Sequence, residues 1–187
     1  MSENTTQHLS VEALPDYEPT VGRWLWACED TRRQTRDTLT GLEQTVLDWM
    51  PFQGGNSIGT LLYHIAAIEL DWLYVEVLEE QAPWQQEMKE LFATDVRDDQ
   101  GHLSAVRGMP LVDHLQRLDR VREHLLTSFR RMTLEEFRRP RSFPAYSVTP
   151  EWVLHHLIQH ETEHRGHIQL LRSWAEQTLG QSNPHSE

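Results

Sequence analysis

Five histidines lie within 13 residues near the carboxyl end of the sequence: His155, His156, His160, His164 and His167. On a helix, which turns about 100° per residue, all of them except His155 fall in one sector about 80° wide. The same sector holds apolar residues and is therefore expected to face the core. Burying an imidazole is unfavourable unless it finds a partner. Because a metal ion supplies such a partner, the pattern indicates metal binding.

His160 and His164 are four residues apart, so on a helix their Cβ atoms lie about 5–6 Å apart. Their rings can then bind one ion, with bonds of about 2.0–2.1 Å if it is zinc. His64 offers a third ligand, because it is the only histidine of its predicted helix and shares an apolar face with Leu61. We therefore predict one divalent ion, zinc or nickel, bound by His64, His160 and His164. The alternative is a set of core histidines hydrogen-bonded to carbonyls or carboxylates.

Other titratable residues have less defined roles. Glu163, at the edge of the histidine sector, is either a proton acceptor or a surface acid. Asp71 either supports the histidine ligands or is exposed at a helix seam. His114 and His124 are expected to be ordinary surface or boundary residues. Cys28 follows bulky apolar residues, where a buried and inert cysteine is commoner than a reactive one.

The elements that must position these histidines are helices. Apolar periodicity, capping residues and breaks at proline and glycine predict four long helices, at about 20–40, 57–81, 110–131 and 150–179. Their number and length predict an all-α fold, a four-helix bundle. We expect the bundle to span residues 18–180, with a flexible arm at 1–17 and a flexible tail at 181–187.

The connections between the long helices are predicted to hold little further structure. Short helices are expected around 42–47 and 86–92, and Pro83 is expected to end the second long helix. The segment 132–149 is predicted to be a loop, and no strand is expected anywhere. The connection 83–109 is long enough to run the length of the bundle, so the second and third helices can lie parallel.

Composition narrows the classes of function. The net charge of −12 disfavours general nucleic-acid binding, although eight arginines lie between Arg117 and Arg141. That cluster is either a basic patch or, as we expect, a solvated helix face. A single cysteine excludes an internal disulfide and a Cys-rich zinc site. Since the sequence shows neither a signal-peptide pattern nor an apolar run of about 20 residues, we expect a cytoplasmic protein without a membrane partner.

Two motifs resemble those of the DinB-like superfamily, also called DinB/YfiT-like. One is Ser57 to His64, SIGTLLYH, and the other is His160 to Ile168, HETEHRGHI. The resemblance extends over most of the chain, from about Trp24 to Leu171. It implies a bundle of up-down-down-up order, with a long crossover between helices 2 and 3. It also implies homodimers.

The same resemblance implies a metal site made by His64, His160 and His164. His167 stands where the family often has glutamine, which leaves open whether it is a passive neighbour or an extra ligand. His156 matches a frequent family histidine that usually is not a ligand.

Relatives in the family include thiol-dependent S-transferases and a mycothiol-dependent maleylpyruvate isomerase. We therefore expect a metal-dependent enzyme that activates a low-molecular-weight thiol or water for attack on a small electrophile. A non-catalytic metal-binding or stress-response protein is the alternative, and a structural module with core histidines is a third. The sequence shows no Ser-His-Asp arrangement, phosphate loop or dinucleotide fingerprint.

Overall fold

Four long helices dominate the fold. The computed structural model describes residues 9–181, so the first eight residues of the predicted arm and the last six of the predicted tail lie outside the described residues. The long helices are α1 (Pro19–Asp37), α3 (Ile58–Trp72), α5 (Leu111–Phe129) and α7 (Pro150–Gln181). The prediction of an all-α four-helix bundle is confirmed.

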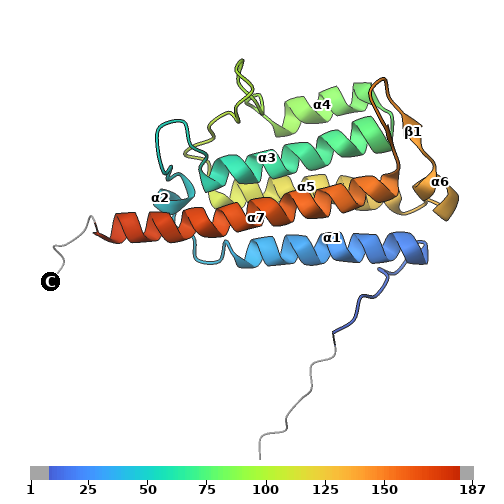
Figure 1. Cartoon of the computed structure of the whole chain (residues 1–187), viewed down its shortest axis with the longest axis horizontal. Helices are drawn as coiled ribbons and strands as arrows, with labels where there is room; N and C mark the ends of the chain where they lie inside the picture. The colour runs from blue at the N-terminus through green and yellow to red at the C-terminus, as the bar shows by residue number, and fades with distance from the viewer. Residues whose placement is uncertain (1–8, 182–187) are drawn as a thin grey trace, which may run out of the picture.

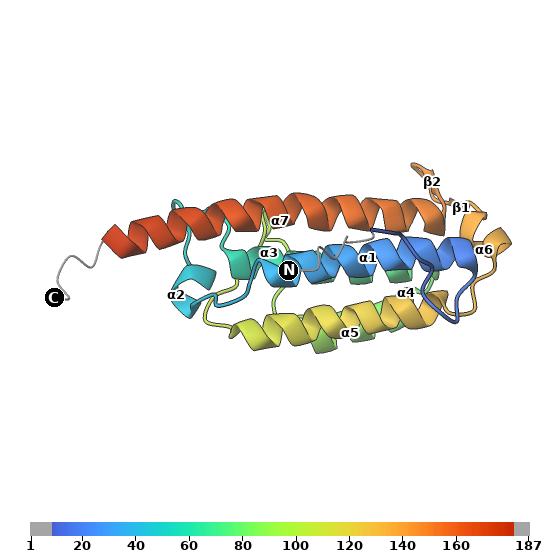
Figure 2. The same ribbon diagram turned by 90° about the horizontal axis from the view of Figure 1, so that it is seen from below.

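The directions of the helices follow the up-down-down-up order. In Figure 1, α1 and α7 run from right to left, whereas α3 and α5 run from left to right. In Figure 2, α1 lies between α7 on one side and α5 on the other. Helix α3 packs against both α5 and α7, so the second and third long helices are parallel neighbours and the chain between them crosses the bundle. This crossover agrees with the expectation from its length.

Capping residues set where the two histidine-bearing helices begin. The Ser57 hydroxyl accepts a hydrogen bond from the Thr60 amide at the start of α3. The Thr149 hydroxyl accepts one from the Trp152 amide, and Pro150 occupies the first position of α7. Side-chain oxygens at an N-cap satisfy amides that have no partner within the helix, and proline at the first position loses no hydrogen bond. Both predicted helix starts are confirmed.

The second long helix ends earlier than predicted. Helix α3 continues into one turn of π-helix, η1 (Leu73–Val77), and the chain leaves the helix at Glu79, whose φ of 58° is left-handed. A left-handed residue cannot continue a right-handed helix. The next helix, α4 (Gln81–Leu91), starts well before residue 86 and contains Pro83 in its first turn. Pro83 therefore does not end the preceding helix, since a proline is tolerated in a first turn, where the amide has no helical partner.

The segment predicted to be a loop, 132–149, contains regular structure. It holds α6 (Leu134–Arg138) and an antiparallel pair of two-residue strands, β1 (Arg141–Ser142) and β2 (Ser147–Val148). The expectation of no strand is wrong here, because two residues are too few to show an alternating pattern. The predicted helix at 42–47 is present as α2 (Gln44–Leu47).

The crossover is tied to α3 by hydrogen bonds. The Tyr63 hydroxyl donates to the Thr94 carbonyl at 2.7 Å and accepts from the Thr94 amide at 3.0 Å. The Val106 amide donates to the Thr60 hydroxyl at 3.1 Å. These bonds hold the segment between α4 and α5 along the start of α3, close to His64.

His114 is buried, which corrects its assignment as a surface or boundary residue. It lies on α5, where it faces α3 at Gly59. A Cβ atom at Gly59 would lie 3.2 Å from the His114 Nε2 atom, so the glycine lets the imidazole approach the α3 backbone. His124 is partly exposed, in agreement with a boundary position.

Helix α3 together with η1, Ile58–Val77, is long and apolar enough to cross a membrane by length and composition alone. Of its most apolar window, 78% is buried inside the bundle, as in the core helix of a folded domain.

Candidate metal centre

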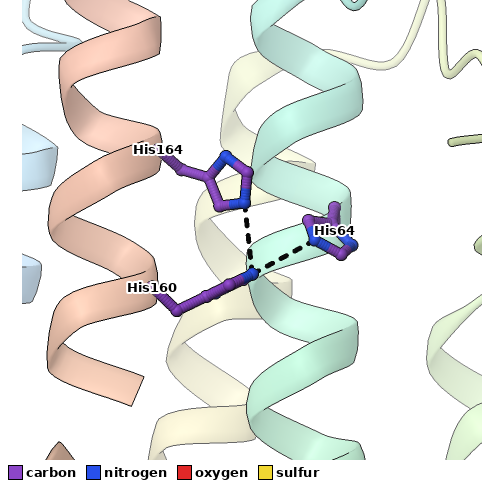
Figure 3. Close-up of side chains that lie close together, drawn as sticks. All are labelled: His64, His160 and His164. Carbon is purple, nitrogen blue, oxygen red and sulfur yellow. Dashed lines mark hydrogen bonds between the residues drawn. The ribbon is translucent and has the colours of Figure 1, made fainter. Parts of the chain in front are cut away.

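Three histidines from two antiparallel helices converge at the seam between α3 and α7 (Figure 3). The Nε2 atom of His160 lies 3.1 Å from the Nε2 atom of His64 and 3.1 Å from that of His164. One ring nitrogen from each of the three lies within 4.8 Å of the others. Since His160 and His164 are one turn apart on α7, only their packing against α3 brings His64 into the group.

The three imidazoles are neutral at pH 7. Burial lowers the pKa of His64 to about 4 and the pKa of His160 to about 3. The nearby ring of His164 further lowers both pKa values. Burial and the nearby His167 also lower the pKa of His164. A neutral imidazole has one nitrogen lone pair, the form that binds a metal ion.

Hydrogen bonding does not satisfy this cluster. A neutral ring nitrogen carries either one proton or one lone pair, so the His160 Nε2 atom cannot make a full hydrogen bond to both neighbours. The Nδ1 atoms of His64 and His164 are buried and have no hydrogen-bond partner among the described residues. The alternative of core histidines bonded to carbonyls or carboxylates therefore finds no support at these two nitrogens.

The spacing of the Nε2 atoms fits one ion. Bonds of about 2.0–2.1 Å and angles between octahedral and tetrahedral values place ligand nitrogens about 2.8–3.4 Å apart. Both 3.1 Å contacts fall in that range. Three histidines could thus hold a divalent ion and leave its remaining positions open, which is the arrangement of catalytic zinc sites.

The other histidines of α7 stand apart from this group. His156 packs against two tryptophans, with ring centroids 4.5 Å from Trp72 and 5.2 Å from Trp152. The exposed His167 contacts His164 through its ring, at a centroid distance of 5.6 Å. Within residues 9–181, neither belongs to the group whose ring nitrogens could bind one ion.

The remaining candidates for chemistry lie away from the cluster. Glu163 is exposed on α7. Asp71 is half-buried, and burial raises the pKa of its carboxyl group. Cys28 is buried, and burial raises the pKa of its thiol to about 12, so it is a poor nucleophile, as expected.

A buried ion network beside the histidines was not predicted from the sequence. Arg32 donates to Glu69 at 2.6 Å and to Glu161 at 2.8 Å, and Arg122 donates to Glu69 at 2.6 Å and to Glu161 at 3.4 Å. Burial by itself raises the pKa of Glu69, but Arg122 and Arg32 outweigh that effect and lower it. The four side chains come from α1, α3, α5 and α7, so the network joins all four long helices. Its signal in the sequence was Glu69, the only carboxylate between Ile58 and Leu70.

The arginine cluster of residues 117–141 is not one solvated face. Arg122 and Arg141 are buried, and the guanidinium group of Arg141 donates to the Val77 carbonyl. Arg117 lies over the Tyr63 ring, 4.7 Å from its centroid. The expectation of a solvated helix face is therefore wrong for these three arginines, because they hold neighbouring elements together.

The comparisons with known proteins agree with the fold. A solved structure of a conserved protein from Enterococcus faecalis matches with a TM-score of 0.62 and 18% identity, over 80% of this chain and 92% of that one. An uncharacterized protein of Bacillus subtilis, YkkA, is 24% identical over 159 residues, which are 84% of this chain and 89% of YkkA. The family model of the DinB superfamily matches residues 27–168, a span that includes all three histidines of the cluster. The chain therefore belongs to the DinB superfamily.

Proposed function

We propose that the protein is a metal-dependent enzyme that activates a low-molecular-weight thiol or water for attack on a small electrophile. The observation that carries the proposal is the convergence of the Nε2 atoms of His64, His160 and His164. A divalent ion bound there, zinc or nickel, supplies positive charge that lowers the pKa of a bound thiol or water.

The chain's own residues define what this centre can do. Three neutral imidazoles add no negative charge, so they leave the full charge of the ion available. The ion network of Arg32, Arg122, Glu69 and Glu161 fixes the packing of α3 against α7 and thereby the spacing of the ligands.

The nucleophile comes from outside the chain, because the only cysteine, Cys28, is buried and protonated. In a thiol transfer, the sulfur forms a bond to the electrophilic carbon and the leaving group departs with its electron pair. The thiol proton passes to solvent.

Turnover with a thiol and a generic electrophile tests the proposal. Metal-loaded protein is incubated with glutathione, bacillithiol or mycothiol and 1-chloro-2,4-dinitrobenzene. We expect turnover that requires metal, persists in Cys28→Ser and is lost in His160→Ala, whereas His167→Ala serves as the matched control on the same helix. Activity that is kept in the metal-free protein but lost in Cys28→Ser would show that the mechanism is wrong.

A non-catalytic metal-binding protein is the second candidate. It is favoured by the position of Glu163, which is exposed and makes no hydrogen bond to the cluster among the described residues. A fully metal-loaded protein without thiol-transfer or hydrolytic activity would make this second function the better one.

A further inference from the structure

An aromatic groove lies further along the seam that carries the histidine cluster. Its volume is about 690 Å³, within the range of small-molecule sites. Its aromatic walls are Trp72 at the end of α3, Trp152 in the first turn of α7, and Tyr146 beside β2. Pro140, Ser147, Val148 and Thr149 complete the lining.

The walls expose large ring surfaces to solvent. Trp152 is 47% exposed and Tyr146 is 46% exposed, whereas the side chains of the neighbouring core are buried. The Trp72 and Trp152 rings lie 5.5 Å apart and are tilted by 41°. Exposing this much aromatic surface is unfavourable in water, and a ligand that covers it recovers that free energy.

The exposed rings are held in place before any ligand binds. Trp152 stacks on His156, with an interplanar angle of 8°. Tyr146 stacks on Phe143, and its hydroxyl donates a hydrogen bond of 2.7 Å to the buried carboxylate of Glu76. Rings that are already fixed lose little conformational entropy when a ligand packs on them.

The lining favours a planar, uncharged ligand. The Thr149 hydroxyl is already used at the N-cap of α7, and the Tyr146 hydroxyl is used by Glu76. No charged side chain lines the groove among the described residues. Stacking and apolar contact are therefore the main interactions on offer, and these suit an aromatic ring.

The groove adjoins the histidine cluster through His156. The His156 ring centroid is 4.5 Å from that of Trp72 and 6.0 Å from that of His160. Trp152 precedes His160 by eight residues on α7 and Trp72 follows His64 by eight on α3, so groove and cluster lie about two helical turns, roughly 12 Å, apart. A molecule of two or three rings spans such a separation.

We propose that the groove binds the aromatic part of the electrophile and so makes planar aromatic compounds the substrate class. The claim that these compounds are substrates rests on the proposed function, whereas the claim that the groove binds them does not. It assigns Trp72, Trp152 and Tyr146 to ligand binding, a role separate from that of the three histidines.

Binding of an unreactive aromatic compound tests the groove separately from catalysis. Isothermal titration calorimetry measures 1,3-dinitrobenzene binding to full-length protein, with and without metal and without any thiol. We expect saturable binding that weakens at least tenfold in Trp152→Leu, recovers in Trp152→Phe and is unchanged in Trp174→Leu. Trp174 is the matched control, since it lies on α7 outside the groove and is 45% exposed.

Three binding results would overturn the inference. The first is the absence of saturable binding, and the second is equal binding by wild type and a Trp152→Leu variant that has wild-type thermal stability. The third is stronger binding of benzyltrimethylammonium than of its uncharged isostere neopentylbenzene, which would assign the groove to a cation. Binding that depends on Trp152 in a protein without turnover would support the groove while the proposed function fails. Turnover of 4-(bromomethyl)biphenyl, whose two rings can span groove and cluster, with a KM that is unchanged in Trp152→Leu would support the function and contradict the groove.

Discussion

The Nε2 atom of His160 lies 3.1 Å from the Nε2 atom of His64, although the two residues are 96 positions apart in the chain. They meet because α3 and α7 pack as antiparallel neighbours, so the cluster exists only in the folded bundle. Anything that binds all three histidines must therefore stabilise the folded protein.

Metal content is the first prediction. Protein purified without an affinity tag should contain about one divalent ion per chain by elemental analysis. His160→Ala removes the central ligand and should weaken metal binding by more than about 100-fold. That is a larger loss than is usual when a residue that only hydrogen-bonds to a metal ligand is removed. His167→Ala, which removes an exposed ring outside the cluster, should bind the metal as tightly as wild type. Full occupancy in a His64→Ala, His160→Ala double variant would rule out the site.

The buried ion network should be a major source of stability. Arg122→Met leaves the buried Glu69 and Glu161 without one of their partners, and removing one member of such a group costs about 3–5 kcal/mol. Urea unfolding should show a loss of that order. Arg33→Met, at a side chain 63% exposed that pairs with Asp30, should change stability by no more than about 1 kcal/mol. Equal losses in the two variants would contradict the assigned role.

Lowering the pH should reduce the free energy of unfolding in part through His114. Burial and Arg117 lower the pKa of His114 to about 4, although Asp48 and Asp113 oppose the shift, whereas the unfolded chain takes up a proton near pH 6.5. Since the unfolded state then binds more protons, stability falls as the pH drops from about 6.5 towards 4.

Urea unfolding of the metal-free protein at pH 7 and pH 5 measures this effect. The stability lost between the two pH values should be smaller in His114→Gln by up to about 2 kcal/mol. The exposed His102→Gln variant should behave as wild type. An unchanged pH dependence in His114→Gln would show that its imidazole is protonated without penalty in the folded state.

Assembly is a separate prediction. We expect a homodimer, so light scattering at micromolar concentration should give about twice the 22.0 kDa chain mass. A monomeric mass that holds across a hundredfold range of concentration would refute this.

Nucleic acid should not bind. The net charge is −12, and Arg117, Arg122 and Arg141 are engaged within the bundle, so only five of the eight arginines of the 117–141 cluster remain to contact phosphates. Fluorescence anisotropy with duplex DNA near physiological salt should show no change. Tight binding that weakens with added salt would identify the exposed arginines of residues 117–141 as a basic surface.

The sequence alone was enough to predict the long helices and the residues that form the histidine cluster. Helical periodicity and capping residues are local properties, so they predicted helices that start at about residues 57 and 150, where Ser57 and Thr149 cap α3 and α7. The spacing of His160 and His164 put both rings on one helix face for the same reason. His64 could be named because it was the only histidine in an apolar helix.

Tertiary structure decided everything that depends on contacts between distant segments. Glu69 and Arg122 pair only because α3 and α5 pack in parallel, and no local pattern shows which charges become buried together. His114 is buried because Gly59 leaves space for it on a different helix. Likewise, Trp72 and Trp152 form one groove only where the end of α3 meets the start of α7. Burial and pairing depend on the whole packed chain, whereas periodicity and capping act within a few residues.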